Sequence, residues 1–209
     1  MSSLINVSST DYIESLNSVV YDHEEERFIN NSNSERRFAL HLRCEDIEIQ
    51  NVYMNECIQV IIGKISERTY RHMIKIDEKL LDIINSSPSF QENSEEVLTI
   101  NSCMRQNSSG DYIIRLDIDD DPESKTYFFE LMQTNLSEPD VNEIEIDKIT
   151  PGMKLDAVLH VTVDIDEIKC EATITSVIEE AQVIQERKTS KKRKPMLLST
   201  TSTTTNNNA

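Results

Sequence analysis

The fold is decided by residues 151–184, which read PGMKLDAVLHVTVDIDEIKCEATITSVIEEAQVI. From 155 to 163 every second residue is apolar, and the residues between them are mostly polar or charged. Successive side chains of a strand point to opposite faces, so this alternation predicts a half-buried β-strand. A polar break at 164–167 precedes a second alternating run at 170–174, which predicts the returning strand of a hairpin.

The same alternation occurs earlier in the chain and predicts further strands at 38–62, 112–118 and 126–132. In 112–118 it places Tyr112 on one face and Arg115 on the other. In 126–132 we expect Tyr127 and Phe129 in the core, which turns Phe128 outward. The opposite possibility, that all these aromatic rings belong to the core, stays open, because only 5% of the residues are aromatic.

Residues 63–84 have helical spacing. At 100° per residue, five basic residues share a face about 80° wide and an apolar stripe lies beside it. The basic residues are Lys64, Arg68, Arg71, Lys75 and Lys79. We expect an amphipathic helix whose basic face is either a binding surface or a solvated face with pairs such as Glu67 and Arg71. The alternative is a strand around 69–74, in which these residues would no longer share a basic face or an apolar stripe.

Charge divides the chain into an acidic body and a basic end. The formal net charge is −17, and residues 1–186 hold 15 basic and 38 acidic residues, a net charge of −23. Residues 187–209 hold six basic residues and no acidic one. A body this acidic repels polyanions at long range, so a nucleic-acid site must be a local basic patch, unless the partner is itself basic.

The composition fits one domain with polar ends. Residues 1–35 are rich in Ser, Asn and Glu, and 187–209 end in TTSTTTNNNA, so we expect disordered segments on either side of a domain at 36–186. Lys191, Lys192, Arg193 and Lys194 precede a proline, a basic cluster of the nuclear-import type that predicts a nuclear location. A direct polyanion-binding tail is the competing interpretation.

Several classes of protein are not indicated. No run of about 18 apolar residues is present, so we expect no membrane span. The four cysteines are widely spaced, which favours reduced thiols over a zinc site. The acidic turn at 119–124 lacks the glycine of a calcium loop. No nucleotide-binding or hydrolase signature occurs, so we expect no cofactor, no metal and no enzyme activity.

The order of these parts resembles the OB-like single-stranded DNA-binding proteins of phages and large nucleocytoplasmic DNA viruses. The matching segments are KIDEKLLDII (75–84), GDYIIRLDID (110–119), YFFEL (127–131) and the closing hairpin. The aromatic residue and Gly-Lys often seen in that family's last hairpin are replaced here by DIDEIKC (164–170), and the family's acidic tail by a basic one. The resemblance implies a mostly β (α+β) fold, an OB-like barrel or small sandwich with one main helix.

The resemblance also implies a function, namely non-enzymatic binding of single-stranded nucleic acid in replication or repair of DNA, by a nuclear and viral protein. Such binding needs cations for phosphates and aromatic faces for bases. The candidate contacts are Lys64, Arg68, Arg71, Lys75, Arg105, Tyr112, Arg115 and Phe128. A homo-oligomer is a further possibility.

Two other functions stay open. An acidic nuclear chaperone or adaptor for basic proteins such as histones would use a carboxylate surface. Its residues would be Asp117, Asp119, Asp120, Asp121 and Glu123, joined by Glu138 and Asp140. A structural or interaction protein of a virus particle is the third possibility.

Overall fold

The structure is a computed structural model. It describes residues 3–6, 16–22, 27–30, 33–37, 39–54, 59–87, 98–119, 121, 125–132, 140–166 and 168–184. The predicted basic tail at 187–209, with the cluster Lys191–Lys194, lies outside the described residues.

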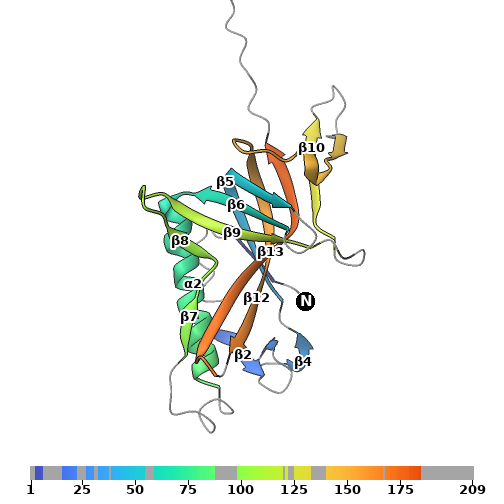
Figure 1. The fold of residues 1–209 in the computed structure, drawn as a ribbon. Helices are drawn as coiled ribbons and strands as arrows, with labels where there is room; N and C mark the ends of the chain where they lie inside the picture. Colours follow the sequence, from blue (N-terminus) through green and yellow to red (C-terminus); the bar gives the residue numbers. More distant parts are fainter. Residues whose placement is uncertain are drawn as a thin grey trace, which may run out of the picture.

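Among the described residues, five strands close into a barrel (Figure 1). They are β5 (Leu40–Met54), β6 (Gln59–Ile65), β9 (Tyr112–Ile118), β12 (Lys154–Asp166) and β13 (Glu171–Ile184). The order is β13–β12–β5–β6–β9, and a parallel pairing between β9 and β13 closes the ring. A closed ring leaves no free edge among its own members, and this five-stranded arrangement is OB-like. The predicted mostly β fold with an OB-like barrel is confirmed.

Shorter elements surround the barrel. Those paired with barrel strands, directly or through β10, are β1 (Ser3–Asn6), β7 (Thr99–Asn101), β8 (Met104–Gln106), β10 (Tyr127–Met132) and β11 (Asp140–Glu143). A separate three-stranded sheet contains β2 (Val19–Asp22), β3 (Arg27–Asn30) and β4 (Asn33–Arg37). Two 3-10 turns, η1 (Leu16–Ser18) and η2 (Ile146–Lys148), and one α-helix, α2 (Glu67–Asn85), complete the described part.

The hairpin of β12 and β13 has the predicted alternation of buried and exposed residues. Leu155, Ala157, Leu159 and Val161 of β12 are all buried, each no more than 5% exposed. On β13 the buried positions shift from even to odd numbers between Ile178 and Ala181, because Glu179 is an extra residue opposite the Val158–Leu159 step. This bulge keeps the apolar side chains of β13 inward along the whole strand, and Glu179 and Glu180 both point outward.

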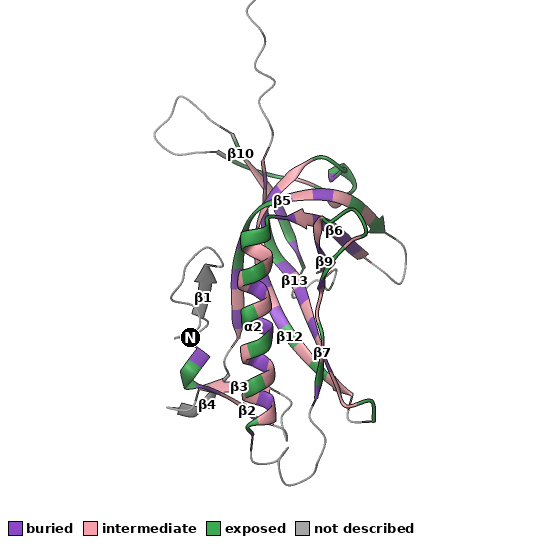
Figure 2. Cartoon of the chain, turned by 90° about the vertical axis from the view of Figure 1, so that its left-hand side faces the viewer, coloured by how far each residue is buried: buried purple, intermediate pink, exposed green. Residues whose placement is uncertain are grey.

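Helix α2 is confirmed, but it begins later than the periodicity predicted. Ser66 is the N-cap, and its Oγ accepts a hydrogen bond from the backbone N–H of Thr69 at 3.0 Å. Lys64 therefore lies on strand β6 and not on the basic helix face, which is a correction. Met73, Ile76, Leu80 and Ile84 form the buried stripe, and the opposite face of the helix is exposed (Figure 2). No helix in the described part of the chain is long and apolar enough to cross a membrane.

The N-terminal segment differs from the linker predicted for 1–35. Leu16, Val19, Tyr21 and Phe28 are buried and belong to the same apolar cluster as the barrel core. Tyr21 and Phe28 meet edge to face, with ring centroids 5.2 Å apart. Short apolar runs among many polar residues hid this contribution, because no run was long enough to show a clear period.

Helix α2 carries a buried carboxylate. Asp77 is 4% exposed and accepts one hydrogen bond, from Ser102 Oγ at 2.6 Å. Burial raises the pKa of Asp77 to about 7, although the Ser102 hydrogen bond opposes this shift. The carboxyl group is therefore protonated in the folded protein over a pH range in which the unfolded chain has already lost the proton.

We expect this difference to make the folded protein less stable as the pH rises from about 4 to about 7. Each pH unit in that range costs at most about 1.4 kcal/mol of unfolding free energy. Asp77→Asn should flatten the slope, measured by urea unfolding at several pH values. Asp82→Asn removes the same charge from an exposed position further along α2 and should leave the slope intact. Equal slopes in wild type and Asp77→Asn would contradict the assignment.

Candidate nucleic-acid interface

Three of the predicted contacts meet on the outer face of the barrel. Lys64 of β6 lies opposite Ile113 of β9, and Ile113 lies opposite Arg105 of β8. Directly opposite residues in antiparallel strands share a face, so Lys64 and Arg105 point the same way. Arg115 is two residues along β9 from Ile113 and joins them. The predicted placement of Arg115 on the face opposite Tyr112 is thus also what the structure shows.

Two of these cations are paired with carboxylates of the same surface. Lys64 Nζ lies 2.7 Å from Asp111 Oδ1, and Arg115 Nε lies 3.0 Å from Asp117 Oδ1. The hydrogen bond to Asp111 raises the pKa of Lys64, and the same bond lowers the pKa of Asp111. Solvent screens exposed pairs of this kind, so a phosphate can replace the carboxylate at little cost.

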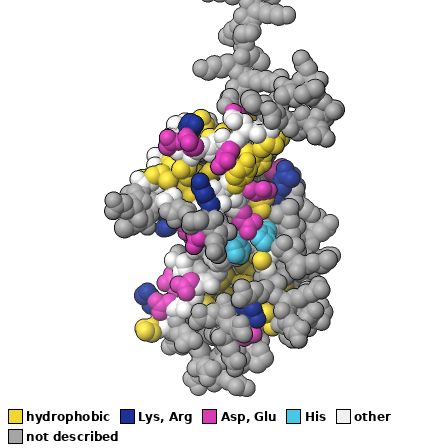
Figure 3. Space-filling view, turned by 90° about the vertical axis from the view of Figure 1, so that its right-hand side faces the viewer, with side chains coloured by type: hydrophobic (Ala, Val, Ile, Leu, Met, Phe, Trp, Pro, Cys, Tyr) yellow, Lys and Arg dark blue, Asp and Glu magenta, His cyan; other side chains and the backbone are white. Residues whose placement is uncertain are grey.

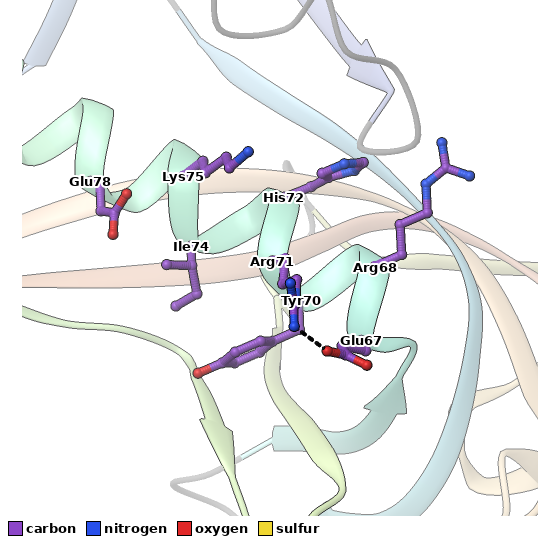
Figure 4. A pocket seen from close by; sticks show the side chains of 8 residues that line it. All are labelled: Glu67, Arg68, Tyr70, Arg71, His72, Ile74, Lys75 and Glu78. Carbon is purple, nitrogen blue, oxygen red and sulfur yellow. Dashed lines mark hydrogen bonds and ion pairs between the residues drawn. The ribbon is translucent and has the colours of Figure 1, made fainter.

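A second basic surface lies on α2. Arg68, Arg71 and Lys75 are exposed and line a groove of about 740 Å3 along the helix. Figure 4 shows Arg68, His72 and Lys75 on one side of the helix, as their spacing requires. Arg71 Nη2 donates a hydrogen bond to Glu67 Oε1 at 2.5 Å, the pair foreseen for a solvated helix face.

A stacked pair of tyrosines connects α2 to β9. The rings of Tyr70 on α2 and Tyr112 on β9 lie 4.6 Å apart, centroid to centroid, with an interplanar angle of 29°. Tyr112 follows Asp111, the partner of Lys64, and Tyr70 precedes Arg71. The stack therefore holds the start of β9 close to the first turns of the helix, with Tyr112 on the face of β9 opposite Arg115.

Phe128 is a correction, because it is buried at 3% exposure and not available for stacking. It lies opposite Ala181 in the parallel pairing of β10 with β13, and Ala181 points inward. The neighbouring Tyr127 and Phe129 point outward instead. A period of two does not say which half of the residues faces the core. Thr126 is buried, and its hydroxyl donates to the Ile178 carbonyl at 2.5 Å, so Thr126 and Phe128 both face inward.

Pattern reasoning also missed a histidine pair. His41 and His160 are cross-strand partners whose rings stack 5.2 Å apart, and His41 Nε2 donates to Glu179 Oε1 at 2.8 Å. Burial lowers the pKa of His160, and the adjacent His41 acts in the same direction. His41, His160 and Glu179 come from three strands, and His41 is far from both others in sequence, so no local signal could have found this contact.

Comparisons with known proteins give similarities of fold. The single-stranded DNA-binding protein of bacteriophage Enc34 has 10% identity and a TM-score of 0.44, covering 78% of this chain and 88% of that one. The same phage protein in complex with single-stranded DNA gives a TM-score of 0.45 at 10% identity, covering 80% and 96%. The single-stranded DNA-binding protein gp2.5 of bacteriophage T7 gives 0.46 at 10% identity, covering 69% and 91%.

These solved structures are of the class that the sequence resemblance named. No family model matches this chain, and the search of curated proteins gave no match. At 10% identity and TM-scores below 0.5, the similarities do not establish what this chain binds. Its function therefore depends on its own residues.

The tyrosine contact should couple α2 to the sheet. Aromatic pairs contribute about 0.5–1.5 kcal/mol beyond the area that they bury. In a double-mutant cycle with Tyr70→Ala and Tyr112→Ala, we expect the double variant to lose less unfolding free energy than the sum of the two single effects, by an amount in that range. Tyr53→Ala, which truncates an exposed tyrosine on β5, is the control and should add independently to either change. Strict additivity of Tyr70→Ala and Tyr112→Ala would show that the stack carries no coupling.

Proposed function

We propose that this protein binds single-stranded nucleic acid, without catalysis, on the surface from the outer face of β6, β9 and β8 to the exposed face of α2. The observation that carries the proposal is the local charge. Residues 59–118, from the start of β6 to the end of β9, hold seven basic and nine acidic residues, a net charge of −2, within a body of net charge −23. The acidic excess thus lies almost entirely elsewhere, and a polyanion meets least repulsion here.

The fold supports the same surface by analogy. OB-fold barrels bind oligonucleotides on the face of their second and third strands and on the adjoining loops. In this barrel those strands are β6 and β9, which carry Lys64 and Arg115. Because a fold does not determine function, the support for this surface comes from the basic residues that β6 and β9 carry.

Each residue has a role in the proposal. Lys64, Arg105 and Arg115 contact phosphates on the barrel, and Arg68, Arg71 and Lys75 extend the track along α2. The partly buried tyrosine pair Tyr70 and Tyr112 provides an aromatic edge for bases where α2 meets β9, and stacking is tolerant of sequence. Phe128 has no part, since it is buried.

The cellular setting is part of the proposal. The tail cluster Lys191–Lys194 serves nuclear import, and the protein acts on DNA during replication or repair. The charge pattern supports this arrangement, because the import cluster follows the acidic residues 1–186 in the sequence and carries the opposite charge.

A second candidate function is binding of basic proteins such as histones, favoured by one pocket. This pocket has a volume of about 410 Å3, and Asp119, Glu143, Glu145 and Asp147 line it together with apolar side chains such as Phe128. Asp119 was among the carboxylates predicted for this role. Asp120, Glu123 and Glu138 lie outside the described residues.

The nucleic-acid proposal predicts a position-specific decrease in affinity. We expect Lys64→Glu, Arg105→Glu and Arg115→Glu each to weaken binding of a labelled single-stranded oligonucleotide in fluorescence anisotropy. The slope of log affinity against log salt should fall by about 0.7 for each phosphate that the variant no longer neutralises. Lys148→Glu is the matched control, since it reverses an exposed lysine on η2 and should leave affinity nearly unchanged.

The tail is tested separately in the full chain. Replacing Lys191, Lys192, Arg193 and Lys194 by Gln should leave binding by the barrel surface in place. If only this replacement abolished binding, or if Lys148→Glu weakened binding as much as Lys64→Glu, the proposed site would be wrong. Absence of binding by wild type at low salt would favour the basic-protein function.

A further inference from the structure

An apolar surface on β10 and β11 is not used by the proposed function. Tyr127, Leu131 and Val141 are 38%, 43% and 52% exposed. Phe129 lies between Tyr127 and Leu131 on the same face, and its ring stacks on Tyr127 with centroids 5.7 Å apart. Val141 lies directly opposite Leu131 in the antiparallel pairing of β10 and β11. We name these four side chains the β10–β11 platform. Adjacent exposed apolar residues of this kind mark interaction sites.

Carboxylates border the β10–β11 platform. Glu143 lies opposite Phe129, and Glu180 lies opposite Tyr127. Neither glutamate forms a salt bridge within the part of the chain that the structure describes. Figure 3 shows hydrophobic side chains beside acidic ones on this side of the molecule. Such a surface repels nucleic acid and fits a segment that combines apolar side chains with cations.

The chain itself supplies such a segment. Lys191–Leu198 reads KKRKPMLL, four cations followed within two residues by Met196 and two leucines. The body before Arg187 contains no comparable cluster of cations. The segment therefore has both the positive charge and the apolar content that would complement the β10–β11 platform.

The tail also starts beside the platform. Gln182 of β13 lies opposite Phe129, so Ile184, two residues on, shares the face and level of Leu131. Ile184 is the last described residue. Six residues lie between it and Lys191, and the seven Cα-to-Cα steps allow a reach of up to about 23 Å. A short connection holds a tethered segment at about millimolar effective concentration, so a weak contact is sufficient.

We propose that Lys191–Leu198 docks on the β10–β11 platform of the same molecule. Lys191–Lys194 meet Glu143 and Glu180, and Met196 to Leu198 cover Tyr127, Leu131 and Val141. Docking occupies the basic cluster, which is then released by a competitor for its cations. The proposal does not rest on nucleic-acid binding, because the platform lies on strands outside the proposed nucleic-acid surface.

Hydrogen exchange of the full-length protein, followed by mass spectrometry, tests this docking. Replacing Lys191, Lys192, Arg193 and Lys194 by Glu should make the backbone amides of β10 and β11 exchange several-fold faster, because the covering segment is repelled. The control replaces Lys191, Lys192 and Lys194 by Arg, which keeps the charge and should leave exchange unchanged. Amides of β5 and β6 should not respond in either variant.

A charge swap adds specificity to the test. Glu143→Lys with Glu180→Lys should also accelerate exchange in β10 and β11, and combining these changes with the Glu-substituted tail should restore protection. Identical exchange in wild type and the Glu-substituted tail would overturn the proposal. Protection that rises with protein concentration would also overturn it, since that result assigns the contact to a second copy.

Discussion

The rest of the structure depends on the backbone pairing of β13. This strand pairs with β12 along its whole length, with β7 and β9 on part of its other edge, and with β10 further along that edge. The bulge at Glu179 allows β13 to pair with all four strands, because it keeps the buried side chains of β13 inward while the strand bends. The closed barrel, the position of β6 and β9, and the site of the β10–β11 platform follow from this one strand.

Two surfaces of the protein differ in charge, one on β6, β8 and β9 and the other on β10 and β11. Lys64, Arg105 and Arg115 lie on the outer side of β6, β8 and β9, where the local charge nearly cancels. The β10–β11 platform combines apolar side chains with Glu143 and Glu180. The proposed binding of a polyanion on one surface and of a cationic segment on the other is therefore compatible with a body of net charge −23.

How much the sequence could predict varied with how local the signal was. The hairpin at 151–184 could be predicted because its alternation is long and one of its faces is buried in the barrel core. The helix was readable from its apolar stripe, but its start was not, because Lys64 continues the basic spacing while Ser66 provides the cap. Phe128 was predicted on the wrong face because alternation does not say which set of residues faces the core. The hydrogen bond of Thr126 to β13 shows which set it is.

Contacts between distant segments could not be predicted at all. The stack of Tyr70 on Tyr112 depends on where α2 crosses the end of β9, and the pairing of His41 with Glu179 depends on a bulge. Residues 1–35 looked like a linker because their few apolar residues are scattered, yet Leu16 and Phe28 complete the core. Composition reports the average of a segment, whereas burial depends on single side chains.

The most direct test of the account is to map an oligonucleotide onto the folded protein by NMR. Isotope-labelled full-length protein is titrated with a short single-stranded oligonucleotide, and the shifts of backbone amides are followed residue by residue. The account predicts that the largest changes fall on β6, β8, β9 and the first two turns of α2, around Lys64, Arg115 and Tyr112. Changes confined to β10 and β11, or to residues 187–209, would contradict it.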